Sequence, residues 1–281
     1  MKKTFPSVLK SLHFLSLDVA AGAVISSWMF WKLPLGTGSP DRVTLITLGI
    51  CTWFIYLTDR LLDIIHTEKV ELTHRHSFIA KHQYNIQVLT IALGLAGLFL
   101  CFFMPLHVLF PGIAIALCMG GYFFLINKTG QITTFFTHTK EIAVTIIYTA
   151  AVVGIPLYNR SSLNLSDWIL AACFLLIVFQ NLITFSLFEH LDNPENHNIV
   201  RFTGKKAAKR VINFIALVVI FTAIFLFSGG AGYTNKVALI EVLMTLTLSF
   251  MPALPAFFAG NERYRWLGDL VFLYPLLILF A

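Results

Sequence analysis

The stretch VTLITLGICTWFIYLTDRLLD, residues 43–63, is a long apolar run that stops at two acids, Asp59 and Asp63. A second long apolar run stops in the same way, at the sequence EHLD of residues 189–192. Carboxylates are costly in hydrocarbon, so acids held at the depth of a membrane are a functional hypothesis by default. The two stretches predict a membrane protein with acids in matching places in its two halves.

The composition leads to the same class of protein. Of the 281 residues, 57% are hydrophobic and only 12% are charged, whereas a soluble domain carries about 25% charged residues. The formal net charge is +6. In a membrane protein, excess Lys and Arg report topology and contact with anionic lipid. We therefore expect membrane lipid, and no nucleic acid, as a partner.

The apolar runs predict about nine crossings, because a transmembrane helix needs about 20 predominantly apolar residues. The turns between them are short and leave no room for a separate soluble domain. We predict an all-α, multi-pass membrane protein in which residues 1–281 form a single transmembrane domain. The expected helices are 8–31, 43–65, 85–104, 108–126, 139–158, 166–190, 211–229, 237–258 and 266–281.

The basic residues predict how the chain is oriented. Of the 20 Lys and Arg residues, only Lys32, Arg42, Arg160 and Lys236 fall on the side opposite the N-terminus, and the other 16 share its side. Cytoplasmic loops carry an excess of Lys and Arg. We expect a cytoplasmic N-terminus, an external C-terminus and a bacterial inner (plasma) membrane. Both acidic clusters then face the cytoplasm.

Each acidic cluster places two carboxylates on one helix face. Asp59 and Asp63 are four residues apart, and Glu189 and Asp192 are three apart, which makes each pair neighbours on a helix. Such acids repel each other near a helix C-terminus, which already carries partial negative charge. Mg²⁺ prefers one or two carboxylates, several waters and phosphate oxygens. We predict that the four acids hold Mg²⁺; the alternative is that each cluster is a solvated helix end.

Phosphate oxygens also need cationic partners. Lys140 lies where the expected fifth helix begins, although a lysine that extends to the membrane surface is an equally simple explanation. Aromatic faces can stabilise a carbocation, and Tyr148 lies in the same helix. The candidates for substrate binding are therefore Arg60, Arg75, Lys128, Lys140, Tyr148 and Arg201.

With these motifs, the chain resembles the UbiA superfamily of intramembrane prenyltransferases. That family has nine transmembrane helices and two aspartate-rich motifs, in the cytoplasmic loops after helices two and six. The first motif, usually NDxxDxxxD, aligns with residues 55–63, where Asp59 and Asp63 match and the Asn-Asp start is replaced by Ile-Tyr. The second corresponds to residues 185–195, with a different spacing of the acids.

The resemblance implies transfer of an isoprenyl group from an isoprenyl diphosphate to a lipophilic acceptor. Asp59, Asp63, Glu189 and Asp192 would hold Mg²⁺, the implied cofactor. Arg75 and Lys140 would bind diphosphate oxygens. Asp59, Asp63 and Lys140 are accordingly the expected catalytic residues.

Two other functions are compatible with the sequence. A secondary transporter for an anionic or lipid-linked solute would also use repeated halves and buried charges. A non-catalytic scaffold could keep the fold after losing the chemistry, because both motifs depart from the family pattern.

Overall fold

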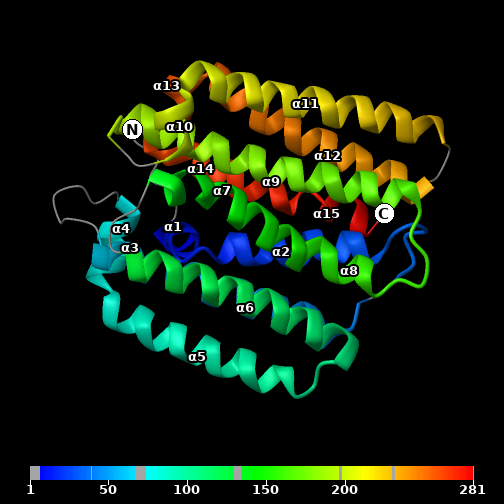
Figure 1. The fold of residues 1–281 in the computed structure, drawn as a ribbon, viewed down its shortest axis with the longest axis horizontal. Coiled ribbons are helices and arrows are strands. Elements are labelled where there is room, and N and C mark those ends of the chain that lie inside the picture. Colours follow the sequence, from blue (N-terminus) through cyan, green and yellow to red (C-terminus); the bar gives the residue numbers. More distant parts are fainter. Residues whose placement is uncertain are drawn as a thin grey trace. The chain divides into compact units, whose positions relative to one another are not determined.

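The computed structural model describes residues 7–38, 40–66, 74–129, 134–195, 198–229 and 232–280, which form helices and no strand (Figure 1). The all-α prediction is thus confirmed. The chain divides into two compact units. Unit 1 contains residues 1–24 and 41–105, and unit 2 contains residues 25–40 and 106–281.

Unit 1 is built around α3, which packs along α5, with α4 in contact with both. Its core contains the buried side chains of Leu57, Ile79, Ile86 and Leu93. The elements of this unit are α1 (Ser7–Phe14), the first part of α2 (Leu17–Trp31), α3 (Arg42–His66), α4 (His74–Lys81) and α5 (Gln83–Cys101).

Unit 2 is built around α9, which contacts α7, α11, α12 and α14; α9, α11 and α12 lie side by side in Figure 1. The long helices are α6 (Leu106–Thr129), α7 (Thr134–Thr149), α9 (Leu165–Asp192), α11 (Lys205–Ser228) and α12 (Gly232–Phe250). The short segments are η2 (Ala150–Gly154), α8 (Ile155–Tyr158), α10 (Ile199–Thr203), η3 (Met251–Ala253), α13 (Pro255–Ala259), η4 (Gly260–Glu262), α14 (Arg263–Leu270), η5 (Val271–Leu273) and α15 (Leu276–Leu279).

One buried side chain ties the three central helices of unit 2 together. The amide nitrogen of Gln180, on α9, donates to the carbonyl of Ile212 at 3.0 Å and to the hydroxyl of Ser249 at 2.9 Å. Its oxygen accepts a hydrogen bond from the hydroxyl of Thr245 at 2.7 Å. Because lipid tails are as apolar as Leu, interhelical hydrogen bonds and close packing hold such helices together in place of a hydrophobic driving force.

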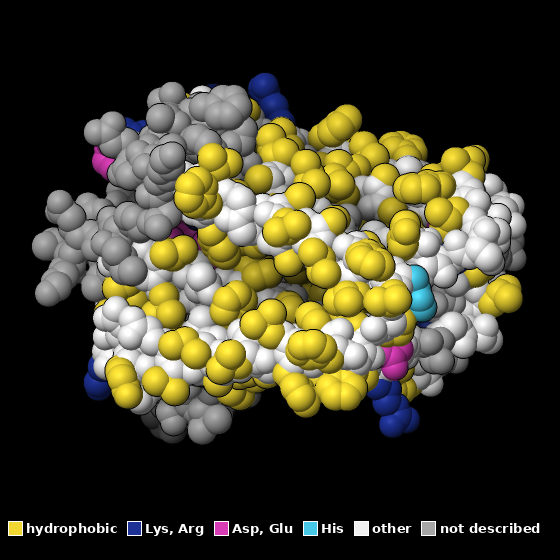
Figure 2. Space-filling model, turned by 60° about the horizontal axis from the view of Figure 1, so that its bottom comes forward, with side chains coloured by type: hydrophobic (Ala, Val, Ile, Leu, Met, Phe, Trp, Pro, Cys, Tyr) yellow, Lys and Arg dark blue, Asp and Glu magenta, His cyan; other side chains and the backbone are white. Residues whose placement is uncertain are grey.

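Seven helical segments of the described residues are long and apolar enough to cross a membrane. Figure 2 shows hydrophobic side chains spread over the face that it draws, and exposed Phe side chains occur on α5, α6 and α11. The seven segments are Arg42–Ile64, Gln83–Cys101, Leu106–Leu125, Lys140–Tyr158, Leu165–Asp192, Lys205–Ser228 and Gly232–Ala253.

The other two expected helices, 8–31 and 266–281, are interrupted. Ser16 adopts a left-handed backbone with φ 57°, which ends α1 and leaves α2 with 15 residues. Trp53 donates its indole N–H to the carbonyl of Leu15 at this break, at 2.8 Å. Near the C-terminus, Pro275 precedes α15, and proline cannot donate the N–H that a continuous helix needs.

The expected helix 139–158 changes geometry along its length. Residues 150–154 form a π-helical turn, in which the N–H of Ile155 donates to the carbonyl of Ala150. Pro156 follows directly. The proline ring would clash with the preceding turn of a regular α-helix, so the wider turn accommodates it within the membrane-length segment.

Candidate functional site

Asp59 and Asp63 lie near the C-terminal end of α3 and share one guanidinium group. Nη1 of Arg60 is 3.7 Å from Oδ2 of Asp59 and 3.3 Å from Oδ2 of Asp63. The Arg60 side chain is 14% exposed, whereas the two acids are 27% and 30% exposed. Both acids thus pair with Arg60 and keep side chains that solvent can partly reach. The structure therefore brings together three of the predicted site residues.

Glu189, in the last turn of α9, forms an ion pair with Arg265 of α14. Nη2 of Arg265 is 2.7 Å from Oε1 of Glu189, and its Nε is 3.6 Å from Oε2 of Glu262. The same Nε donates to the hydroxyl of Tyr264 at 3.0 Å. Asp192, the other acid of the predicted second cluster, is the exposed last residue of α9. The sequence predicted Mg²⁺ at Glu189 and gave no sign of the ion pair with Arg265.

The protonation states of this group follow from its surroundings. Burial alone would lower the pKa of Arg265, but the carboxylate of Glu189, with smaller contributions from Tyr264 and Glu262, raises the pKa overall. Burial raises the pKa of Tyr264 to about 12, and the positive charge of Arg265 offsets part of that effect. Arg265 is therefore charged and Tyr264 neutral at physiological pH.

Tyr148 belongs to a series of aromatic contacts inside unit 2. Its ring is 5.8 Å from that of Phe272, which lies 5.9 Å from the ring of Phe174. Phe174 in turn meets Phe30 edge to face at 5.2 Å. These distances are typical of favourable aromatic pairs. The four rings come from α7, η5, α9 and α2, so they form an apolar, π-rich interior.

The remaining predicted basic residues lie on separate elements. Lys140 is an exposed residue of α7 and the first residue of a membrane-length segment. Arg201, on α10, binds the backbone carbonyl of Glu195 at 2.7 Å and its carboxylate at 3.0 Å. Arg75 and Lys128 fall in α4 and α6, and their side chains lie outside the described part of the structure.

Glu141 is a buried acid that the sequence analysis did not select. Its Oε1 accepts hydrogen bonds from the hydroxyl of Ser186 at 2.9 Å and from the backbone N–H of Ile199 at 3.2 Å. Asn198 completes the junction by donating to the carbonyl of Ser186 at 3.0 Å. The carboxylate thus joins α7, α9 and α10. Its position directly after Lys140, at the start of an apolar run, was the available signal.

Glu241 is a second acid that the sequence analysis missed. It lies in the middle of α12 with 1% of its surface exposed, and its Oε1 has no hydrogen-bond partner within the described ranges. On neighbouring helices, the thiol of Cys173 is 3.0 Å from the hydroxyl of Thr222. An acid inside the expected helix 237–258 was a clear sequence signal, because ionisable residues within a membrane helix are rare.

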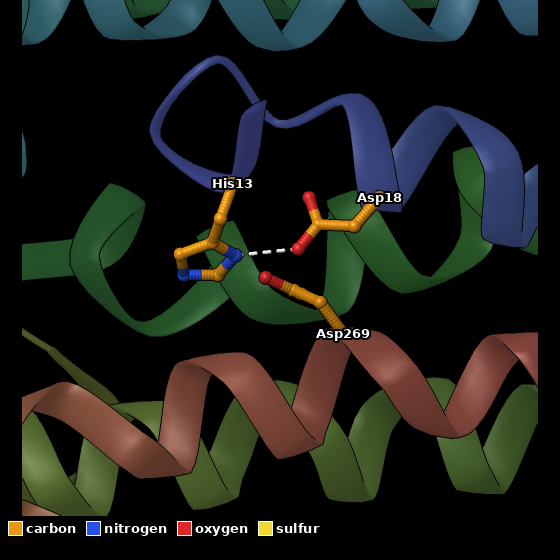
Figure 3. Close-up of side chains that lie close together, drawn as sticks. All are labelled: His13, Asp18 and Asp269. Carbon is orange, nitrogen blue, oxygen red and sulfur yellow. Dashed lines mark hydrogen bonds and ion pairs between the residues drawn. The ribbon is translucent and has the colours of Figure 1, made fainter. Parts of the chain in front are cut away.

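Asp18, in the first turn of α2, forms a local contact in unit 1. Its Oδ2 accepts a hydrogen bond from Nδ1 of His13 (Figure 3), and its Oδ1 accepts one from the backbone N–H of Val19 at 3.0 Å. This acid in the first turn of α2 offsets the positive end of the helix dipole. Asp269, also labelled in Figure 3, belongs to α14 of unit 2.

No protein-family model matches the chain, and comparison with curated proteins and with solved structures also finds no match.

Proposed function

We propose that the chain is a membrane prenyltransferase of the UbiA type, which moves an isoprenyl group from an isoprenyl diphosphate to an aromatic or other lipophilic acceptor. The observation that carries the proposal is the group of Asp59, Arg60 and Asp63, which offers two partly exposed carboxylates at the end of a membrane-length helix. The proposal includes nine crossings in a bacterial inner membrane, with a cytoplasmic N-terminus and an external C-terminus.

The donor atoms of this group fit Mg²⁺. Asp59 and Asp63 offer hard carboxylate oxygens that are partly open to solvent, and Mg²⁺ is commonly bound through one or two carboxylates with waters and substrate phosphates. When bound, Mg²⁺ supplies positive charge that stabilises the departing diphosphate.

The other residues have roles that follow from their chemistry. Arg60 is proposed to donate hydrogen bonds to diphosphate oxygens, since charge-assisted bonds of this kind are strong. Aromatic faces such as that of Tyr148 are of the kind that can stabilise an allylic cation. In the reaction, the bond between the allylic carbon and the diphosphate oxygen breaks. The acceptor forms a bond to that carbon and loses a proton.

Binding of geranylgeranyl diphosphate to the full chain in nanodiscs, with Mg²⁺ or with EDTA, tests the proposal. We expect Mg²⁺ to strengthen binding and Asp63→Asn to weaken the Mg²⁺-dependent part by about tenfold or more, since even indirect support of a metal ligand is worth about 10-fold to 100-fold. Asp41→Asn is the matched control, because Asp41 lies just before the opposite end of α3, where its carboxylate accepts from the N–H of Thr44.

The competing functions predict different outcomes. Loss of an acid without any change in Mg²⁺-dependent binding would contradict the prenyltransferase assignment. A scaffold should bind no diphosphate. A transporter should move a bound anionic or lipid-linked solute across a vesicle membrane without changing it chemically, whereas the proposed enzyme should release diphosphate when it is incubated with acceptor extracts.

The proposed topology can be tested separately. The four native cysteines are first replaced, and Arg201→Cys and Asn159→Cys are then labelled with a membrane-impermeant reagent in intact cells. We expect labelling of the second and protection of the first. External labelling at position 201 would contradict the cytoplasmic placement of the second acidic cluster.

A further inference from the structure

We propose that Arg265 is the resident cation of Glu189, so that this acid holds a guanidinium group in place of a metal ion. The inference rests on the proposed function for its ligand, a metal diphosphate. It departs from the expectation that Glu189 ligates Mg²⁺, and it assigns metal binding to the Asp59–Asp63 pair.

Both partners stand at helix ends where their charges are unfavourable on their own. Glu189 is in the last turn of α9, where the helix dipole disfavours an acid. Arg265 is in the first turn of α14, where the dipole disfavours a base. The 2.7 Å ion pair gives each charge the opposite charge that its own helix end lacks. Each partner therefore stabilises the other, and removal of either one would leave an unfavourable charge at a helix end.

Packing on both sides fixes this pairing. Tyr264 stacks on Phe188, with ring centroids 4.7 Å apart and planes 10° apart, so the residues that precede Arg265 and Glu189 are also in contact. One turn further along α14, a Cβ at Gly268 would lie 2.3 Å from the ring of Phe185. The absent side chain lets α14 approach α9 closely enough for the guanidinium to reach the carboxylate.

The chain enters α14 through a strained turn. Asn261 and Glu262 both have left-handed backbones, with φ 55° and 54°. Non-glycine residues adopt this conformation at a cost, and it persists only where the surrounding structure enforces it. The turn places the carboxylate of Glu262 within 3.6 Å of Nε of Arg265. The same guanidinium thus faces two acids and a tyrosine hydroxyl.

Burial separates the roles of the two partners. The Arg265 side chain is 7% exposed, while that of Glu189 is 31% exposed. A metal ion at Glu189 would have to share the carboxylate with a buried, permanently charged guanidinium close by, and like charges repel strongly where water is scarce. Glu189 is therefore a positioning residue for Arg265, and its carboxylate is paired with the guanidinium group instead of a metal.

The test uses Mn²⁺ as a paramagnetic substitute for Mg²⁺, with inorganic diphosphate and the full chain in nanodiscs. Electron paramagnetic resonance gives the Mn²⁺ dissociation constant and the number of bound ions. We expect Glu189→Gln to change this constant less than about twofold, and Asp63→Asn to raise it about tenfold or more. A tenfold loss in Glu189→Gln would overturn the inference.

A second variant covers the case in which Glu189→Gln fails to fold. The double variant Glu189→Gln/Arg265→Gln removes both charges, and a buried ion pair that is replaced as a whole is often tolerated. We expect it to bind Mn²⁺ as the unmodified chain does, whereas loss of Mn²⁺ binding would again assign Glu189 to the metal. If Asp63→Asn changes nothing, the proposed function fails; if only the Glu189 variants behave unexpectedly, the inference alone fails.

Discussion

Adding a single methyl group to Gly268 should destabilise unit 2. A Cβ at this position would lie 2.3 Å and 2.7 Å from two ring carbons of Phe185 and 2.7 Å from Oδ1 of Asn181. Ordinary carbon contacts are about 3.5–4.0 Å, so the ring and the amide must both move. Overpacking of this kind costs about 1–3 kcal/mol, and the better helix propensity of Ala returns about 0.8–1.0 kcal/mol.

With two neighbours obstructed, the overpacking cost should lie near the upper end of that range, about 3 kcal/mol, so we expect a net loss of about 2 kcal/mol for Gly268→Ala. At about 2–4 °C per kcal/mol, the unfolding temperature should fall by about 4–8 °C, which intrinsic fluorescence of the protein in nanodiscs can measure. The matched control is Gly260→Ala, because a Cβ at Gly260 meets no atom within 4 Å. Equal or greater stability of Gly268→Ala would refute the close packing of α14 on α9.

Three further changes test other buried groups. The pKa of Tyr264 is raised from 10.0 to about 12, so the stability that its neutral hydroxyl confers is present below pH 10 and lost between pH 10 and pH 12. Over that range the unfolding temperature of Tyr264→Phe should fall less than that of the unmodified protein. Glu241→Leu should leave the unfolding temperature unchanged or raise it, because it removes a buried carboxyl group whose Oε1 has no hydrogen-bond partner among the described residues. A large fall in the unfolding temperature would contradict this expectation. Arg160→Ala removes the 2.7 Å ion-pair partner of the fully buried Asp167 and should lower the free energy of unfolding by about 3–5 kcal/mol. Adding Asp167→Asn to this variant should restore part of that loss in the same thermal assay.

The long helices were predictable because length and hydropathy alone determine them. The expected helices 43–65 and 108–126 correspond to α3 (Arg42–His66) and α6 (Leu106–Thr129), with differences only at their ends. The interruption at Ser16 was not predictable in the same way. A left-handed φ in a non-glycine residue depends on tertiary contacts such as the bond from Trp53, which no local pattern encodes.

The candidate site was predictable only where its residues are close in sequence. Asp59, Arg60 and Asp63 lie within one turn, so helix periodicity alone brings them together. The partner of Glu189 is Arg265, 76 residues away, and hydropathy gives no register between α9 and α14. Several basic residues were equally eligible for that acid, and only the packed structure distinguishes among them.

Two hydrogen bonds have a consequence for biosynthesis. They join the second half of α2, and the segment just after it, to the C-terminal segment. Ser26 donates to the carbonyl of Phe272, and Lys32 to that of Leu279, across 246 and 247 residues. At about 5–20 residues per second, translation separates such partners by roughly ten to fifty seconds. Residues 25–40 therefore remain in the translocation machinery or the bilayer until the rest of unit 2 has been synthesised. Unit 1, in contrast, has all its residues once residue 105 has been made. Nascent chains arrested before residue 272 should accordingly contain an assembled unit 1, whereas the second half of α2 still lacks its hydrogen-bond partners from the C-terminal segment.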